Sequence, residues 1–291
     1  MDIVDAQVHL SRDSVGATLE SMDALGINGL VIDECWYTLN GTDPTHFDPG
    51  FELSNGAWRA IYPTALLAAT LHPDRFCYLV RVDRNDPDLD ALLRILRSEP
   101  GARAIRIQPA WTMAEAQAFA SGAYDELFAL AEKYALPVFV FIPGFVELLP
   151  RYLAKFPRVK VIVDHCGMAF PSIPYDRPEA DRQRVENLSY FDEVLKLAEF
   201  PNVALKWGHA QRGFNAHEYP YAGILPFLRK AITAFGADRL MWASDNSVIP
   251  EQTWADLLGY VRDCAELTRE EKEWILGRSA RQWLNWPAAN K

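Results

Sequence analysis

The sequence predicts a single (β/α)8 barrel, an α/β fold, with loop insertions at its C-terminal face. The length of 291 residues lies near the roughly 250 residues typical of such barrels. About eight short apolar segments alternate with longer helical patterns, and no linker or change of composition divides the chain. We therefore expect residues 1–291 to form one domain, and we consider a doubly wound parallel sheet the less favoured alternative.

The expected strands are short, and several are apolar at nearly every position. This pattern is typical of parallel strands that are covered on both faces. The strands are Ile3 to His9, Leu30 to Asp33, Phe76 to Asp83, Ala104 to Gln108, Val138 to Ile142, Lys160 to His165, Val203 to Trp207 and Leu240 to Asp245.

The segments between the strands have apolar residues at helical spacing. Ala17 to Leu25 is an expected helix that stops at Gly26, and Ala123 to Tyr134 is another. Thr268 with Glu271 has the form of a capping box at the start of a C-terminal helix.

Two longer inserts, at about residues 36–60 and 168–187, follow the second and sixth strands. Both are therefore expected at the C-terminal face, where barrels carry their active-site loops.

The composition excludes several classes of partner. A net charge of -10 argues against nucleic acid and anionic membranes. The four cysteines, Cys35, Cys77, Cys166 and Cys264, form no CxxC pair, and reduced thiols are expected. The N-terminus does not resemble a signal peptide, and no apolar run approaches the roughly 20 residues of a membrane span. We expect a soluble, cytoplasmic protein.

Polar side chains gather at the ends of seven of the eight expected strands. Because uncompensated charges in a barrel mouth cost several kcal/mol, this placement predicts a functional site. The residues in strand order are Gln7 and His9, Asp33 and Glu34, Arg81 and Asp83, Arg106 and Gln108, Asp164 and His165, Lys206 with His209 beyond it, and Ser244 and Asp245. The fifth strand ends without such a group, at Phe141 and Pro143.

Each of these residues also has a structural interpretation. His9 can cap the barrel interior, and Asp245 can cap the next helix. The cations Arg81, Arg106 and Lys206 can form ion pairs with Asp33, Glu34 or Asp83. His209 can be a plain loop residue, and Trp111, Trp207 and Trp242 can serve packing alone.

Several short motifs of the sequence resemble those of a known enzyme family. Asp5-Ala-Gln-Val-His9, Asp164-His165-Cys-Gly167 and Trp242-Ala-Ser-Asp245 resemble the amidohydrolase-related branch of the amidohydrolase superfamily. The segments from His72 to Phe76 and from Asn202 to Lys206 are also similar to that branch. The resemblance covers essentially the whole chain and implies a barrel enzyme.

The chain departs from the metal-using members of that branch at two positions. Gln7 stands where they have the first histidine of His-x-His, and Phe141 lies at the strand end where the metal-dependent decarboxylases have a histidine ligand. A catalytic zinc takes three protein ligands and a water. The nearest template is therefore the pyrone dicarboxylate lactonase group, which hydrolyses without metal. No cofactor is expected; if zinc or manganese binds, the resemblance assigns it to His9, His165 and Asp245.

These observations predict a hydrolase for a small lactone or ester that bears a carboxylate. Asp245 is the expected general base on a water, with His165 and His9 as the other catalytic residues. Arg81, Arg106 and Lys206 are expected to bind the carboxylate. The remaining expected substrate contacts are Gln7, Trp36, Tyr37, Trp111 and His209.

Two alternatives remain open. One is a metal-dependent decarboxylase or amidohydrolase of the same branch, and the other is a barrel that binds a small molecule without chemistry. The expected partner is a small anionic substrate. A homodimer is possible through aromatic residues near the C-terminus, Trp283 and Trp286, which are expected to be exposed.

Overall fold

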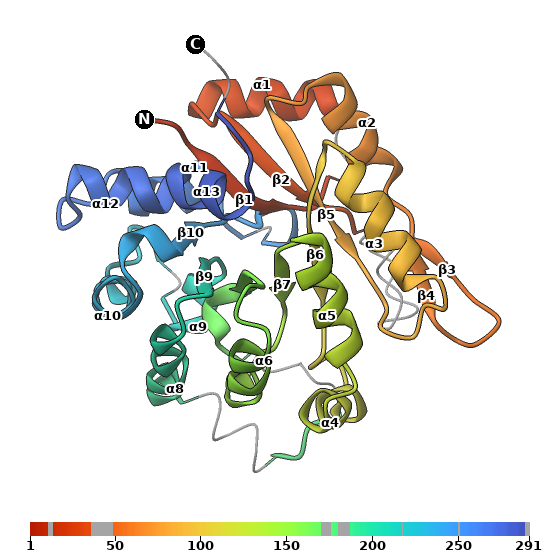
Figure 1. Cartoon of the computed structure of the whole chain (residues 1–291). Coiled ribbons are helices and arrows are strands. Elements are labelled where there is room, and N and C mark those ends of the chain that lie inside the picture. Colours follow the sequence, from red (N-terminus) through yellow and green to blue (C-terminus); the bar gives the residue numbers. More distant parts are fainter. Residues whose placement is uncertain are drawn as a thin grey trace.

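Eight parallel strands form the core of the protein, in a computed structural model that describes residues 1–10, 14–35, 49–169, 176–179, 187–216, 218–249 and 251–288 (Figure 1). The strands are neighbours in the order β1-β2-β5-β6-β7-β8-β9-β10. Their bounds are β1 Val4–Val8, β2 Gly29–Asp33, β5 Phe76–Arg81, β6 Ala102–Ile107, β7 Val138–Val140, β8 Val161–Val163, β9 Val203–Trp207 and β10 Leu240–Trp242. The predicted (β/α)8 barrel is confirmed.

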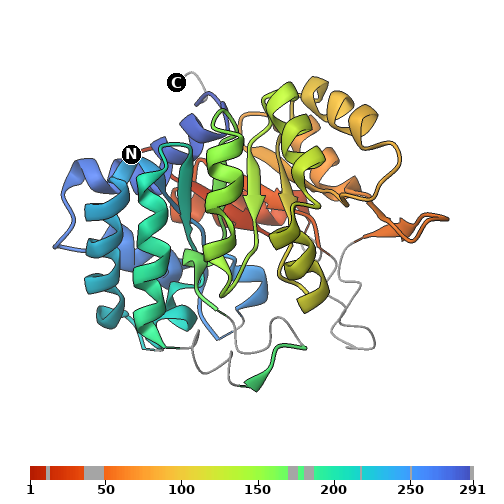
Figure 2. The ribbon, with the colours of Figure 1, turned by 60° about the horizontal axis from the view of Figure 1, so that its bottom comes forward.

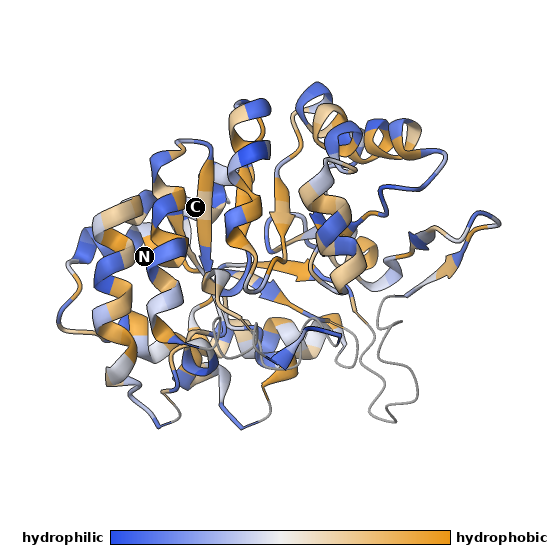
Figure 3. Ribbon diagram, turned by 90° about the horizontal axis from the view of Figure 1, so that it is seen from below, coloured by the Kyte–Doolittle hydropathy of each residue, from blue (hydrophilic) through white to orange (hydrophobic). Residues whose placement is uncertain are grey.

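Helices surround the strands, and Figure 3 shows the mainly hydrophobic colour of the strands beside helices with mixed faces. The helices are α1 Val15–Leu25, α2 Pro63–Leu71, α3 Leu89–Ser98, α4 Met113–Ser121, α5 Asp125–Tyr134, α6 Pro150–Lys155, α8 Phe191–Lys196, α9 Ala210–Gly213, α10 Leu225–Phe235, α11 Trp254–Arg262, α12 Arg269–Glu273 and α13 Ser279–Trp283. The capping box at Thr268 and Glu271 is present at the start of α12. No helix among the described residues is long and apolar enough to cross a membrane.

The barrel is nearly closed between its first and last strands. Each strand pairs by ladder hydrogen bonds with the next strand in this order. The first and last strands, β1 and β10, are instead connected just beyond the end of β10. There the amide of Asp245 donates to the carbonyl of Gln7 at 3.0 Å, and the amide of Ser244 donates to the carboxylate of Asp5 at 2.9 Å. The seam between β1 and β10 therefore depends on a buried side chain.

Six strands end earlier than the sequence predicts, and three of them precede a predicted catalytic residue. β1 stops at Val8, β8 at Val163 and β10 at Trp242, so His9, His165 and Asp245 lie just beyond the ladder. His165 and Asp245 both have a φ of 51°, in the left-handed region, which is incompatible with a continuing strand. The chain thus turns at the positions where the polar side chains begin.

The first insert contains a hairpin that the sequence analysis did not predict. Strands β3 (Gly50–Glu52) and β4 (Trp58–Ala60) pair antiparallel, and Gly56, between them, has a φ of 84° that favours glycine. Figure 2 shows this hairpin, in orange, extending away from the barrel.

The expectation that Trp283 and Trp286 are exposed is wrong. Their exposed fractions are 6% and 2%, because the C-terminal segment packs with residues of the strands such as Val4 and Ala6. A side chain on Gly29 would collide with the ring of Trp286, at 2.8 Å from its Cβ position. These two residues complete the core and offer no exposed aromatic surface for a dimer.

Candidate active site

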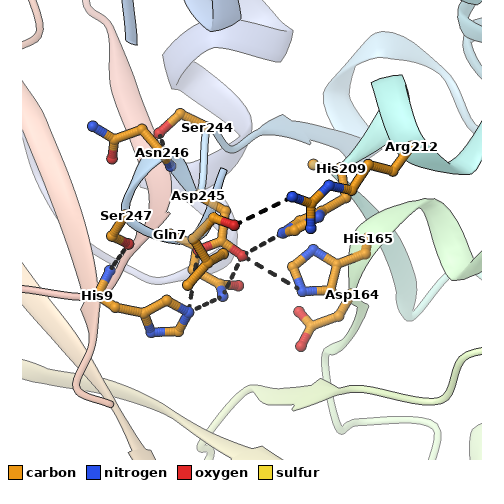
Figure 4. A network of polar contacts seen from close by, with 12 residues as sticks. Gln7, His9, Asp164, His165, His209, Arg212, Ser244, Asp245, Asn246 and Ser247 are labelled. Carbon is orange, nitrogen blue, oxygen red and sulfur yellow. Dashed lines mark hydrogen bonds and ion pairs between the residues drawn. The ribbon is translucent and has the colours of Figure 1, made fainter. Parts of the chain in front are cut away.

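Asp245 lies at the centre of a buried polar cluster beyond the strand ends (Figure 4). Its Oδ2 accepts from Nε2 of His209 at 2.7 Å and from Nε2 of Gln7 at 3.1 Å. Its Oδ1 is 3.1 Å from Nε2 of His9, and Nε2 of His165 is 3.9 Å from Oδ2. In Figure 4, His9 and Gln7 lie on one side of this carboxylate and the other two imidazoles on the opposite side. The structure therefore brings together the three predicted catalytic residues, with Gln7 and His209.

The backbone holds three of these residues in an uncommon conformation. His165, His209 and Asp245 have φ values of 51°, 53° and 51°. A left-handed conformation costs a residue with a side chain on the order of 1–3 kcal/mol and is concentrated at functional sites. Close packing also fixes this region, since a Cβ on Gly208 would lie 3.2 Å from the carbonyl oxygen of Ala243. Three strained positions around one carboxylate indicate that the rest of the fold imposes their geometry.

A chain of ion pairs occupies the neighbouring part of the mouth. Asp33 accepts from Nε and Nη2 of Arg81 at 2.9 and 2.7 Å, and it also pairs with Arg106. Asp164 binds Nε of Arg106 and Nζ of Lys206, both at 2.7 Å. The three predicted carboxylate-binding cations are thus all present in the mouth, and each is paired with a buried aspartate.

Gln7 joins the ion pairs to the histidine cluster. Its Oε1 accepts from Nζ of Lys206, while its Nε2 donates to Asp245. The side-chain amide of Gln7 supplies both an acceptor and a donor, so this one residue makes both contacts. The replacement that sets this chain apart from metal-using relatives therefore has a structural function of its own.

Burial and neighbouring charges shift the pKa values in the cluster. Burial opposes ionisation of Asp245, but His9 and His209 outweigh it and hold the pKa of this carboxyl well below its ordinary value. Burial, assisted by the charge of Lys206, lowers the pKa of His165 well below its ordinary value. Burial likewise lowers the pKa of Lys206, with Asp164 opposing the shift. At neutral pH the site thus holds an ionised Asp245 beside a neutral His165.

The most compact group of metal-binding side chains differs from the one that the resemblance implied. Among the described residues, ligand atoms of His165, His209 and Asp245 all lie within 4.8 Å of one another. His9 contacts Asp245 but also places its Nδ1 2.5 Å from the carbonyl oxygen of Asp33. Two imidazoles and a carboxylate are a donor set that zinc accepts, so these three residues fit such an ion.

The remaining predicted residues fall into three groups. Trp111 lies beside the mouth, where its ring centroid is 6.0 Å from that of Phe141. Trp207 and Trp242 are buried core residues, with exposed fractions of 0% and 1%. Trp36 and Tyr37 lie outside the described residues.

Comparison with known proteins shows the family of the chain. The sequence profile of the family described as Amidohydrolase (Amidohydro_2) matches residues 30–286. Among characterised relatives, the L-fucono-1,5-lactonase of Burkholderia ambifaria is 29% identical over 106 residues, which are 35% of this chain and 31% of that protein. The match therefore spans only about a third of either protein.

Solved structures with low sequence identity share the fold. An amidohydrolase from Burkholderia multivorans with bound zinc has a TM-score of 0.70 at 17% identity, over 99% of this chain and 100% of that one. A 2-pyrone-4,6-dicarboxylic acid hydrolase candidate from Pseudomonas putida has a TM-score of 0.67 at 17% identity, over 98% of both chains. The 2,6-dihydroxybenzoate decarboxylase from Rhizobium is similar at a TM-score of 0.59 and 13% identity, over 98% of this chain and 99% of that one.

Proposed function

Because this chain belongs to the amidohydrolase family, we propose that it hydrolyses a small lactone or activated ester, with Asp245 as the general base and without an obligatory metal. The observation that carries the proposal is a carboxylate that is 1% exposed, ionised, and surrounded by His9, His209 and Gln7. The names of the Burkholderia ambifaria lactonase and the Pseudomonas putida hydrolase support lactone chemistry.

The proposed reaction begins with a water molecule next to Asp245. The carboxylate takes a proton from this water while the water oxygen attacks the lactone carbonyl carbon. The negative charge that develops on the carbonyl oxygen is stabilised by N–H donors of the mouth, for which His9, neutral His165 and the ammonium of Lys206 are candidates. The ring C–O bond then breaks, and Asp245 returns the proton to the departing oxygen, which leaves a hydroxy acid.

Binding of a substrate carboxylate by Arg81, Arg106 and Lys206 remains a prediction. Since each cation is paired with Asp33 or Asp164, a substrate carboxylate has to share them with these aspartates. Such sharing is possible because a guanidinium has five N–H donors.

A metal-dependent hydrolase or decarboxylase is the second candidate, and the compact group of ligand atoms favours it. His165, His209 and Asp245 would hold zinc or manganese, which would polarise a substrate oxygen and lower the pKa of a bound water. In that reaction Gln7 and Lys206 would still orient Asp245.

Metal removal separates the two candidates. The protein is purified without chelator, its metal content is measured by elemental analysis, and hydrolysis of a panel of lactones and aryl esters is followed before and after dialysis against dipicolinate. The proposal predicts lactone hydrolysis that survives dialysis. Loss of activity together with a stoichiometric metal, and recovery with zinc or manganese, would support the second candidate. Ligand binding without turnover across the panel would indicate a non-catalytic barrel.

A further inference from the structure

A separate cavity of about 340 Å³ lies beside the catalytic mouth, within the size range of small-molecule pockets. We call it the hairpin pocket because the β3–β4 hairpin contributes one wall and the ends of β5 and β6 another. Its lining includes Trp58, Arg81, Asp83, Arg106, Gln108 and Trp111. Arg81 and Arg106 belong to both the pocket and the ion pairs of the mouth, so the two spaces adjoin.

A row of aromatic rings connects the pocket to the catalytic cluster. The ring centroids of Trp111 and Phe141 are 6.0 Å apart, and those of Phe141 and His165 are 5.5 Å apart in an edge arrangement. His165 in turn lies 4.4 Å from His209, which binds Asp245. These ring contacts place the hairpin pocket next to the catalytic cluster.

The charges of the pocket do not favour an anion. Arg81 and Arg106 are paired with Asp33, and Arg84 binds both oxygens of Glu115 at 3.0 and 3.3 Å. Glu115 and Asp83 themselves line the pocket. A carboxylate entering here would compete with the protein's own carboxylates for the guanidinium groups, so it would gain little electrostatic energy.

The hydrogen-bonding groups that remain suit hydroxyl groups. The side-chain amide of Gln108 makes no hydrogen bond within the described ranges of the chain, and it offers both donors and acceptors. Each oxygen of Asp83 accepts one backbone amide, from Trp58 and from Asn85, both at 2.8 Å, and retains a lone pair. A ligand hydroxyl can donate a hydrogen bond to Asp83, and another can both donate to and accept from the amide of Gln108. The apolar C–H faces of the ligand can pack on the indole rings of Trp58 and Trp111.

We infer that the hairpin pocket binds the non-reacting part of the substrate and that this part is neutral and polyhydroxylated, with Gln108 as a specificity-determining residue. The inference rests on the proposed lactone hydrolysis and replaces the predicted substrate carboxylate with hydroxyl groups. A site that hydrogen-bonds hydroxyl groups discriminates against analogues that lack them, because its polar groups then lose these partners.

Three kinds of lactone test this inference by turnover. δ-Valerolactone has no hydroxyl group, the gluco, galacto and manno 1,5-aldonolactones are neutral polyols, and a δ-valerolactone carboxylate carries a charge. We expect kcat/KM for the best aldonolactone to exceed that for both others at least tenfold. In Gln108→Leu this preference should fall at least fivefold, because kcat/KM should fall further for the aldonolactone than for δ-valerolactone. Gln117→Leu is the matched control, since Gln117 lies exposed on α4 and does not line the pocket.

Two results would overturn the inference while leaving lactone hydrolysis intact. One is a preference for the carboxylate lactone, and the other is an equal loss on all lactones in Gln108→Leu.

A binding experiment tests the pocket without requiring that the protein hydrolyse any lactone. Tryptophan fluorescence is titrated with the 1,5-anhydroalditols of the same three configurations and with glutarate. Binding of one anhydroalditol that Gln108→Leu weakens at least fivefold supports the pocket assignment, even where no lactone is hydrolysed and the proposed function fails. Tighter binding of glutarate than of every anhydroalditol would contradict it.

Discussion

The mouth of the barrel has two sides that differ in how their charges are compensated. On the ion-paired side, defined by Asp33, Arg81, Arg106 and Asp164, each charge faces an opposite charge on another side chain. On the imidazole side, defined by His9, His165, His209 and Asp245, no lysine or arginine of the described chain pairs with the carboxylate. Lys206 and Gln7 join the two sides.

This difference distinguishes structural from chemical functions. A carboxylate between two guanidinium groups is held as an acceptor and has little capacity left to take a proton. The pKa of Asp245 is lowered as well, but its partners are imidazoles, which can themselves gain or release a proton, and perturbed groups of this kind are typical of active sites. Substitutions on the ion-paired side should therefore change stability most, whereas those on the imidazole side should change turnover.

The largest effect on stability is expected for Asp33→Asn. Removing one partner of a buried ion pair costs about 3–5 kcal/mol, because the remaining charge is left uncompensated. Arg81 and Arg106 both lose a partner in this variant. Urea denaturation measures the change in the free energy of unfolding. Asp90→Asn, which breaks an exposed pair with Lys133, is the control and should change little. An equal change in the free energy of unfolding in the two variants would contradict the expectation that the buried pairs of Asp33 stabilise the fold more than the exposed pair of Asp90.

The next effect is expected for His165→Asn, on turnover. We expect kcat/KM for the best lactone to fall at least a hundredfold, in the range of general acid–base contributions, with an unfolding midpoint near that of the wild type. His72→Asn is the control, since His72 follows α2 outside the cluster. A hundredfold loss of kcat/KM together with a large loss of stability would indicate that His165 has a structural function, like the residues of the ion-paired side.

A smaller effect on turnover is expected for Asp5→Asn. The carboxylate of Asp5 accepts from the amide of Ser244 at 2.9 Å and from Nε1 of Trp254 at 2.8 Å, and it also binds the hydroxyl of Ser244. It thus positions the residue before Asp245, and we expect kcat to fall about tenfold with KM nearly unchanged. An unaltered kcat would show that the seam between β1 and β10 holds Asp245 without Asp5.

The smallest effect is a difference in how stability depends on pH. Arg106 and Arg81 overcome the effect of burial and lower the pKa of Asp33, so its stabilising contribution is present above the ordinary carboxyl pKa and is lost as the pH falls through the folded value. Burial raises the pKa of Asp5 to about 6, so its contribution is full below the ordinary value of 3.8 and is lost as the pH rises through about 6. Urea denaturation between pH 4 and 7 should therefore show wild type losing stability relative to Asp5→Asn as the pH rises. A constant difference between the two proteins would contradict this sign.

The strand pattern predicted most of the fold, and the polar residues at the strand ends predicted most of the residues that gather in the candidate site. Parallel strands with polar last residues place those residues at one end of a barrel, whatever the detailed register. That reasoning located His9, His165, Asp245 and the three cations correctly in one mouth. It could not assign the partners of the cations, since pairing Arg106 with both Asp33 and Asp164 depends on the register between strands and on side-chain length.

Other features were missed because no local pattern reports them. His209 was predicted as a substrate contact, but its hydrogen bond to Asp245 was not. It lies two residues beyond Trp207, and its left-handed backbone turns it back toward Asp245. Trp283 and Trp286 were expected on the surface because nothing local shows that the C-terminal segment packs against the strands.

The most direct test of the central claim is the kcat/KM of Asp245→Asn for the best lactone, measured in metal-depleted buffer together with its urea unfolding curve. The proposal predicts a loss of at least a hundredfold, because an amide cannot take the proton from the attacking water, with a stability close to that of the wild type. Near-wild-type turnover in this variant would contradict the assignment of Asp245 as the general base.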